Sequence, residues 1–344
     1  MKFSLPSIIL VALLSIIPVI REKITCRNGC ESIQLVNNRV VIEADVAGER
    51  LAFIVGLAHT SEIRSDNVGR TYLSVQNKLI ECEKKEFDGA QISFGSDMCP
   101  NNLELPLNGI YGHDLLAGCS QVFSIDFEKL KLCNLSNEQK IDMIPAENFL
   151  EVDSRFSNGK VKIALTINWK VYWFTVDTAY DGTFLMGYNE NLPFLKEPHT
   201  VWERAEPMRS GDRLYYNKGV WLNGTGYNSS ITTAKINADS KVGVAFLKGF
   251  NWIFDHTAKK VYFKKNSVGL DSFAQNQEHQ VSIINNKLVI TARRSLNRKY
   301  DLGSIISAIN GVTVTSENIC EVREQLVHNI NWQQIGISIV KETE

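Results

Sequence analysis

The residues best suited to chemistry lie in a short polar loop near the middle of the 344-residue chain. Asp177, Thr178 and Ala179 directly follow an apolar stretch that ends at Val176. A carboxylate at the end of a buried strand can act as an acid, as a base or as a ligand group. It can also accept hydrogen bonds from the backbone of residues 178–182 and simply stabilise a turn. The sequence leaves both interpretations of Asp177 open.

An internal repeat places a second loop opposite this one. Residues 40–63 align without a gap on residues 161–184, and Gly56 then falls on Asp177. Each copy has an alternating strand, a short turn and a second apolar strand that ends in the polar loop, which is the pattern of a β-hairpin. The loop of the first copy runs from Gly56 to His59, so the first copy has no carboxylate at the equivalent position.

Each copy has a matching second element further along the chain. Residues 108–116 and 242–247 are glycine-containing apolar strands that lead into a short helical turn. Residues 122–132 and 251–263 then follow the pattern apolar-Asp-x-x-x-Lys-x-apolar, which is typical of a hairpin. The repeat therefore extends well beyond the polar loop.

These elements predict a mainly β protein with two similar lobes. We place the first lobe at 32–135 and the second at 155–266, with a linker rich in Asn, Glu and Pro near 134–150. A different, β-rich domain with one main helix is expected at 270–344. Three units agree with a length well above that of one average domain.

The loop at Asp177, with its apolar strand, the later apolar-glycine strand and the closing hairpin, resembles the Asp-Thr-Gly or Asp-Thr-Ala signature of aspartic peptidases of the pepsin and retropepsin type. The resemblance implies two acid-protease-like β-barrel lobes, each supplying one Asp. The two carboxylates share a proton and activate a water, while the Thr and the small residue that follow hold them coplanar. It therefore implies catalytic roles for Asp177, Thr178 and Ala179, with Gly56 as the degenerate counterpart.

Two functions compete because only one of the two carboxylates is present. Leu57 stands where the second copy has Thr178, so the first loop has lost a hydroxyl as well. In the first hypothesis the chain is an aspartic endopeptidase in which Asp177 works with His59 as a substitute base, or with Asp177 of a second chain. In the second it is a pseudopeptidase of the cell envelope that binds extended peptide or protein in the interlobe cleft without cutting. A surface-loop role for His59 and a purely structural role for the protein stay open.

The tail is similar to a PDZ domain. Residues 300–314 resemble the PDZ core strand and its Ile-Asn-Gly turn, with a capped helix expected at 316–327 behind them. Further strands are expected at 287–293 and 335–340. No clear glycine-rich carboxylate-binding loop precedes Lys287, so we expect weak or no capture of C-terminal peptides, with partner recruitment by strand addition as the implied mode.

The N-terminus and the cysteines predict export. An apolar run from Leu5 to Ile20 follows Lys2, so residues 1–25 are expected to be a signal peptide or an uncleaved membrane anchor. The predicted location is periplasmic, cell-envelope or secreted. Six of the seven cysteines could form up to three disulfides, which would leave Cys320 unpaired: Cys26, Cys30, Cys82, Cys99, Cys119 and Cys133.

Composition excludes several function classes. A net charge of -1 leaves no basic surplus for nucleic-acid binding. The spacing of cysteines and histidines completes no metal site, and no phosphate-binding, dinucleotide-binding or zinc-peptidase motif occurs, so no cofactor and no metal are expected. The basic residues Arg293, Arg294, Arg298 and Lys299 are expected to form a solvated surface. Oligomeric state and peptide sequence do not follow from these patterns.

Overall fold

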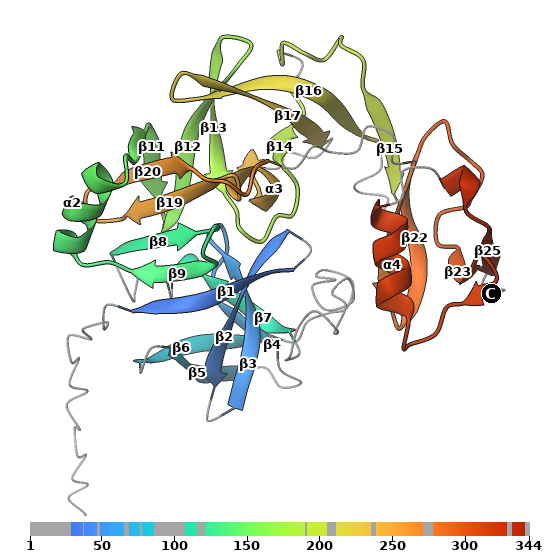
Figure 1. Cartoon of the computed structure of the whole chain (residues 1–344), viewed down its shortest axis with the longest axis horizontal. Coiled ribbons are helices and arrows are strands. Elements are labelled where there is room, and N and C mark those ends of the chain that lie inside the picture. The colour runs from blue at the N-terminus through green and yellow to red at the C-terminus, as the bar shows by residue number, and fades with distance from the viewer. Residues whose placement is uncertain are drawn as a thin grey trace, which may run out of the picture.

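The computed structural model describes residues 29–36, 38–46, 49–64, 69–75, 78–85, 107–114, 116, 121–189, 191–204, 211–234, 239–270, 278–328 and 332–340. The protein is mainly β, as expected (Figure 1). No helix within these residues is long and apolar enough to cross a bilayer. The expected leader at 1–25 lies outside the described residues.

The first sheet has its strands in the order β10-β20-β19-β8-β9-β1-β2-β3-β7-β4-β6-β5. Their bounds are β1 (Cys30–Val36), β2 (Arg39–Val46), β3 (Glu49–Gly56), β4 (Glu62–Arg64), β5 (Gly69–Val75), β6 (Lys78–Lys85), β7 (Leu107–Gly112), β8 (Val122–Asp126), β9 (Lys131–Asn134), β10 (Leu150–Val152), β19 (Phe250–Asp255) and β20 (Lys260–Lys265). This sheet contains the predicted first lobe together with the closing hairpin of the second.

The second sheet has the order β11-β12-β13-β18-β14-β17-β16-β15-β22-β23-β24, with β21 paired to β22 and β25 to β23. Its bounds are β11 (Ser154–Ser157), β12 (Lys160–Ile167), β13 (Lys170–Val176), β14 (Phe184–Gly187), β15 (Thr200–Arg204), β16 (Asp212–Leu222), β17 (Thr225–Ala234), β18 (Lys241–Val242), β21 (His279–Ile284), β22 (Lys287–Arg294), β23 (Ile305–Ile309), β24 (Val312–Thr313) and β25 (Ile337–Val340). The tail thus continues the sheet of the second repeat.

The two copies of the repeat have the same strand pairing. In the β2–β3 hairpin Ile42 lies opposite Phe53, and in the β12–β13 hairpin Ile163 lies opposite Phe174. These are the pairs that the gap-free alignment superimposes. The second strand of each hairpin then pairs in parallel with a short strand, β3 with β7 and β13 with β18. The duplication is therefore present in the structure as well as in the sequence.

A shared apolar core supports both polar loops. Phe53 and Phe174 are fully buried in one cluster, together with Val55 and Val176, the residues just before the loops. Along β12, buried and half-buried positions alternate, as the period of a strand with one core face requires. Burying each such aromatic or branched side chain stabilises the fold by about 1.5–3 kcal/mol. The loops consequently emerge from the most buried part of the molecule.

The closing hairpins join the two copies. Strand β8 pairs in antiparallel fashion with β19, with Phe123 opposite Phe254 and their rings stacked at 5.0 Å. Helix α3 (Val244–Leu247) precedes β19, where the sequence predicts a short helical turn. Because backbone hydrogen bonds link the copies across this sheet, the relative position of their two loops is fixed.

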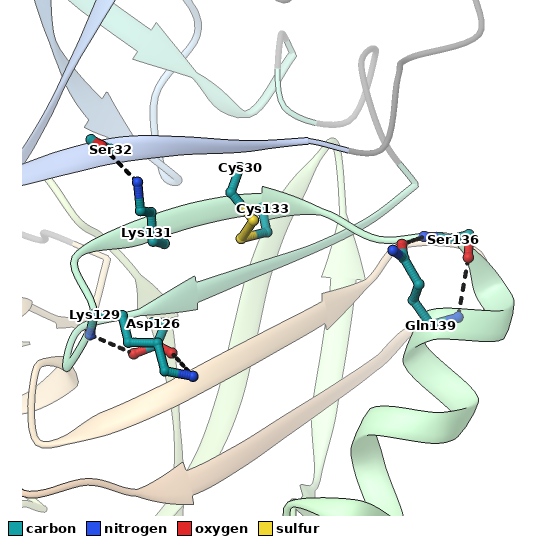
Figure 2. Close-up of a disulfide and its surroundings, with 8 residues drawn as sticks. All are labelled: Cys30, Ser32, Asp126, Lys129, Lys131, Cys133, Ser136 and Gln139. Carbon is teal, nitrogen blue, oxygen red and sulfur yellow. Dashed lines mark hydrogen bonds and ion pairs between the residues drawn. A yellow bond between two sulfur atoms is a disulfide. The ribbon is translucent and has the colours of Figure 1, made fainter.

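The segment between the copies is more ordered than a polar linker. It forms helix α2 (Asn137–Ala146), whose N-terminus is closed by reciprocal hydrogen bonds between Ser136 and Gln139 (Figure 2). Lys140 on this helix pairs with the fully buried Asp255 at 2.5 Å. The capping pair explains why the helix begins where it does, and the ion pair holds it against the closing hairpin.

A disulfide ties the start of the first copy to its end. Cys30 on β1 and Cys133 on β9 are opposite each other in the strand register and bonded, with Lys131 donating to Ser32 beside them (Figure 2). Cys320 is buried and unpaired. The side chains of the remaining cysteines lie outside the described residues: Cys26, Cys82, Cys99 and Cys119.

The tail has its own core and contains a hairpin that the sequence patterns do not reveal. Strands β22, β23 and β25 lie in the expected segments, and helix α4 (Ile319–His328) begins three residues later than predicted. The additional strand β21 joins β22 through Asn285 and Asn286, both with positive φ, as tight hairpins require. His279 on β21 is fully buried against Trp332, and neither of its ring nitrogens has a hydrogen-bond partner. Burial, followed by the charges of Arg293 and Lys299, lowers the pKa of His279 to about 4.

The expected solvated surface is wrong for Arg293, because β22 pairs with β15 of the second repeat. This pairing places Arg293 opposite Glu203, and the two side chains form an ion pair at 2.9 Å. Arg293 is only 13 % exposed and also lies 3.6 Å from Asp301. The tail is therefore attached through backbone and ionic contacts.

Candidate functional site

The two polar loops lie against each other, as the repeat predicts. The Thr178 hydroxyl donates to the carbonyl of Val55 at 2.5 Å and accepts from the N–H of Leu57 at 3.2 Å. One side chain of the second loop thus bridges two backbone groups of the first. Leu57 has no hydroxyl with which to return this contact, so the bridge exists in one direction only.

The loops share a turn geometry despite their different residues. The N–H of His59 donates to the carbonyl of Gly56 at 3.0 Å, and the N–H of Tyr180 donates to that of Asp177 at 3.3 Å. These hydrogen bonds are equivalent in the repeat. The backbone of the first loop has therefore kept its shape, while its side chains have changed.

Asp177 is buried, and both oxygens of its carboxylate have hydrogen-bond partners. It is 1 % exposed, and its Oδ1 accepts from the N–H of Ala179 at 3.1 Å. Its Oδ2 contacts both the Lys241 ammonium at 2.8 Å and the Nε2 of His59 at 3.3 Å. The structure thus brings Asp177, Thr178, Ala179 and His59 together, and it adds Lys241.

These contacts set the charge of Asp177. Burial raises its pKa, but the hydrogen bond from His59 and the positive charge of Lys241 outweigh burial and bring the pKa down to about 2. Asp177 is therefore ionised at all but strongly acidic pH. A carboxylate with so low a pKa holds no proton to donate near neutral pH, and it is a weak base.

The position of the absent carboxylate is filled. A Cβ atom built on Gly56 would lie 2.8 Å from Cγ2 of Ile110 and 3.2 Å from both Cβ and Cδ2 of His59. A side chain at position 56 would have to displace these neighbours. His59 thus occupies space next to Gly56 and uses Asp177 as its partner, so it is not a free surface histidine.

Lys241 was not predicted from the sequence, and the strand pairing of the two copies shows which residue is its counterpart. In the parallel pairing, Ile54 lies opposite Ile110 in the first copy, and Thr175 lies opposite Lys241 in the second. Lys241 is therefore the counterpart of Ile110, next to the loop residue of its own copy. The copy with the carboxylate has the lysine, and the copy with glycine has the isoleucine.

Other ligand groups are scarce. Within the part of the chain that the structure describes, no group of three or more His, Cys, Asp or Glu residues is arranged to hold a metal ion. The solvent-facing groups of the site are His59, whose side chain is 32 % exposed, and Lys241, at 27 %.

Comparison with known proteins gives remote structural similarity only. No protein-family model and no curated protein matches the chain. Among solved structures, conglutin gamma, a basic 7S globulin from lupine seeds, has 10% identity and a TM-score of 0.43, with 70% of this chain and 96% of that one covered. The basic 7S globulin from soybean has 9% identity and a TM-score of 0.39, with 70% and 95% covered. Agreement at this level carries no conclusion about function.

Proposed function

We propose that the chain is an aspartic-peptidase homologue that binds extended peptide between lobes at 32–135 and 155–266 and does not cleave it. The observation that carries the proposal is the engagement of Asp177 Oδ2 by both Lys241 and His59. In the active enzymes of the family the partner of this carboxylate is a second carboxylate.

This arrangement disfavours peptide hydrolysis for a chemical reason. The reaction needs a pair of carboxylates that shares one proton, so that one member accepts a proton from water while the other donates to the carbonyl. Asp177, with a pKa of about 2, has no proton to share. Its oxygens already accept three hydrogen bonds, which leaves little capacity for a water.

The scaffold for binding is retained. The Thr178 bridge, the common turn geometry and the β8–β19 pairing all hold the two copies in a fixed relation. Such a constraint lowers the entropy lost when a ligand is bound. A homologue that binds peptide without cutting it needs these contacts between the two copies but does not need the second carboxylate.

A digest combined with a binding assay tests this proposal. The full chain, Asp177→Asn and His59→Ala are incubated with a peptide library from acid to neutral pH, and peptide binding is measured in parallel by calorimetry. We expect binding without cleavage for the full chain. Cleavage that Asp177→Asn abolishes would refute the pseudopeptidase, and absence of binding to any peptide would refute the binding function.

The contact between His59 and Asp177 favours one second candidate, a hydrolase with an Asp-His pair. With Nε2 protonated toward Asp177, the Nδ1 atom of His59 can accept a proton from water, and Asp177 orients the ring. This mechanism requires both His59 and Asp177 and no second carboxylate. Its test is cleavage that is lost equally in His59→Ala and Asp177→Asn.

We also propose that the protein is exported and that residues 270–344 form a PDZ-like domain which recruits a partner. The Cys30–Cys133 disulfide supports export, because such bonds persist in oxidising compartments. Titration of the full chain with C-terminal peptides tests the domain. We expect weak or no binding, because no clear glycine-rich carboxylate-binding loop precedes Lys287. A micromolar binder that requires a free carboxylate would contradict this expectation and show that the domain captures C-termini.

A further inference from the structure

The Lys241 ammonium is the group of the site that can donate further hydrogen bonds to a ligand. Both oxygens of Asp177 are already used by Ala179, Lys241 and His59. An ammonium has three N–H donors, and within the described residues Lys241 makes its side-chain contact with Asp177 alone. The Lys241 side chain is 27 % exposed, so a ligand can reach these donors from the solvent side.

We propose that Lys241 is the recognition site for a carboxylate of the bound peptide, namely an aspartate or glutamate side chain. This inference rests on the peptide-binding function proposed above and names the ligand chemistry of the same site. The incoming carboxylate replaces the one missing from the first copy, but it approaches from the solvent side, because the space at Gly56 is filled.

The charges at the site favour this ligand over a neutral one. Lys241 is 27 % exposed and Asp177 only 1 %, so a ligand that arrives from solvent meets the positive charge of Lys241 before the negative charge of Asp177. An ammonium donates to both a carboxylate and an amide oxygen, but only the carboxylate adds the attraction between two opposite charges. A glutamate should therefore bind more tightly than the isosteric glutamine, even though both present an acceptor oxygen.

The test uses two pools of heptapeptides with blocked termini, identical except that the central residue is Glu in one and Gln in the other. Acidic residues are left out of the randomised flanks, so the central Glu is the only carboxylate. Binding to the full-length chain is measured by calorimetry at pH 7. We expect the Glu pool to bind about tenfold more tightly, the ratio that corresponds to one charge-assisted contact.

Three variants locate the effect. Asp177→Asn removes the internal competitor for Lys241 and should increase the preference for Glu. The double variant Asp177→Asn/Lys241→Met leaves no unpaired buried charge, so it should fold, and it should bind both pools equally. Lys260→Met is the matched control, since Lys260 forms an exposed pair with Glu151 on a separate hairpin, and it should keep the preference.

The outcomes separate the two proposals. Equal binding of both pools by the wild type would overturn the carboxylate site and leave the peptide-binding function standing. Binding of neither pool would overturn both. A preference for Glu that persists in the double variant would place the recognition elsewhere and would also overturn the assignment to Lys241.

Discussion

Replacing Lys241 by methionine should strongly destabilise the second repeat. Asp177 is 1 % exposed, and its pKa falls from 3.8 to about 2 in the folded protein. A difference of nearly two units corresponds to about 2–3 kcal/mol of stability at neutral pH. Removing the ammonium takes away one of the partners that produce this shift and leaves a desolvated carboxylate. Breaking a buried pair in this way typically costs about 3–5 kcal/mol.

The pH dependence has a definite sign. The unfolded chain takes up a proton on Asp177 at a higher pH than the folded chain does, so acid favours unfolding. The stabilisation is complete above the unfolded pKa and is lost as the pH falls from about 4 toward 2. Without Lys241 the pKa of folded Asp177 should rise toward its unfolded value, so the loss of stability between about pH 4 and pH 2 should become smaller.

Urea unfolding followed by tryptophan fluorescence measures both effects. Wild type, Lys241→Met, Asp177→Asn and the double variant Asp177→Asn/Lys241→Met are compared at pH 7 and at a series of lower values. The double variant should recover much of the stability that Lys241→Met loses, because no buried charge is left alone. Lys260→Met, at an exposed ion pair, should leave the midpoint unchanged. A Lys241→Met midpoint equal to that of Lys260→Met would refute the reasoning.

Three further changes have clear expectations. Gly56→Asp should lower the free energy of unfolding by about 1–3 kcal/mol, because the new side chain overlaps its neighbours. Adding His59→Ala should recover part of this stability in urea unfolding, and no recovery would contradict the geometry. Cys30 and Cys133 are 103 residues apart, and replacing both by alanine should lower the free energy of unfolding by about 4–5 kcal/mol, because the disulfide restricts the unfolded chain. A calorimetric melting temperature equal to that of wild type would contradict this. The tail should lose stability as the pH falls from 6.5 toward 4, because His279 takes up a proton more readily in the unfolded chain than in the folded one. His279→Phe should remove this pH dependence, which hydrogen exchange of the tail measures.

Local patterns in the sequence were sufficient to predict the strands of the two copies and their duplication. Alternating apolar residues specify which face of a hairpin is buried, and a shift of one residue would reverse the faces. This is why the alignment of the two copies predicts the opposition of Ile42 and Phe53 in one and of Ile163 and Phe174 in the other. The same local information was insufficient for β21, where two asparagines make the turn, and for α2, whose residues resemble a polar linker.

The sequence by itself determined that Asp177 ends a buried strand and that Gly56 occupies the equivalent place. Only the tertiary structure decided what surrounds Asp177. His59 is 118 residues away in sequence and reaches Asp177 because the two polar loops lie against each other. Lys241 is 64 residues away and reaches it through the parallel pairing of β13 with β18. Neither contact leaves a periodic signal in the chain, because a salt bridge depends on where side chains end in space rather than on their spacing in sequence. The attachment of the tail through Arg293 and Glu203 was hidden for the same reason.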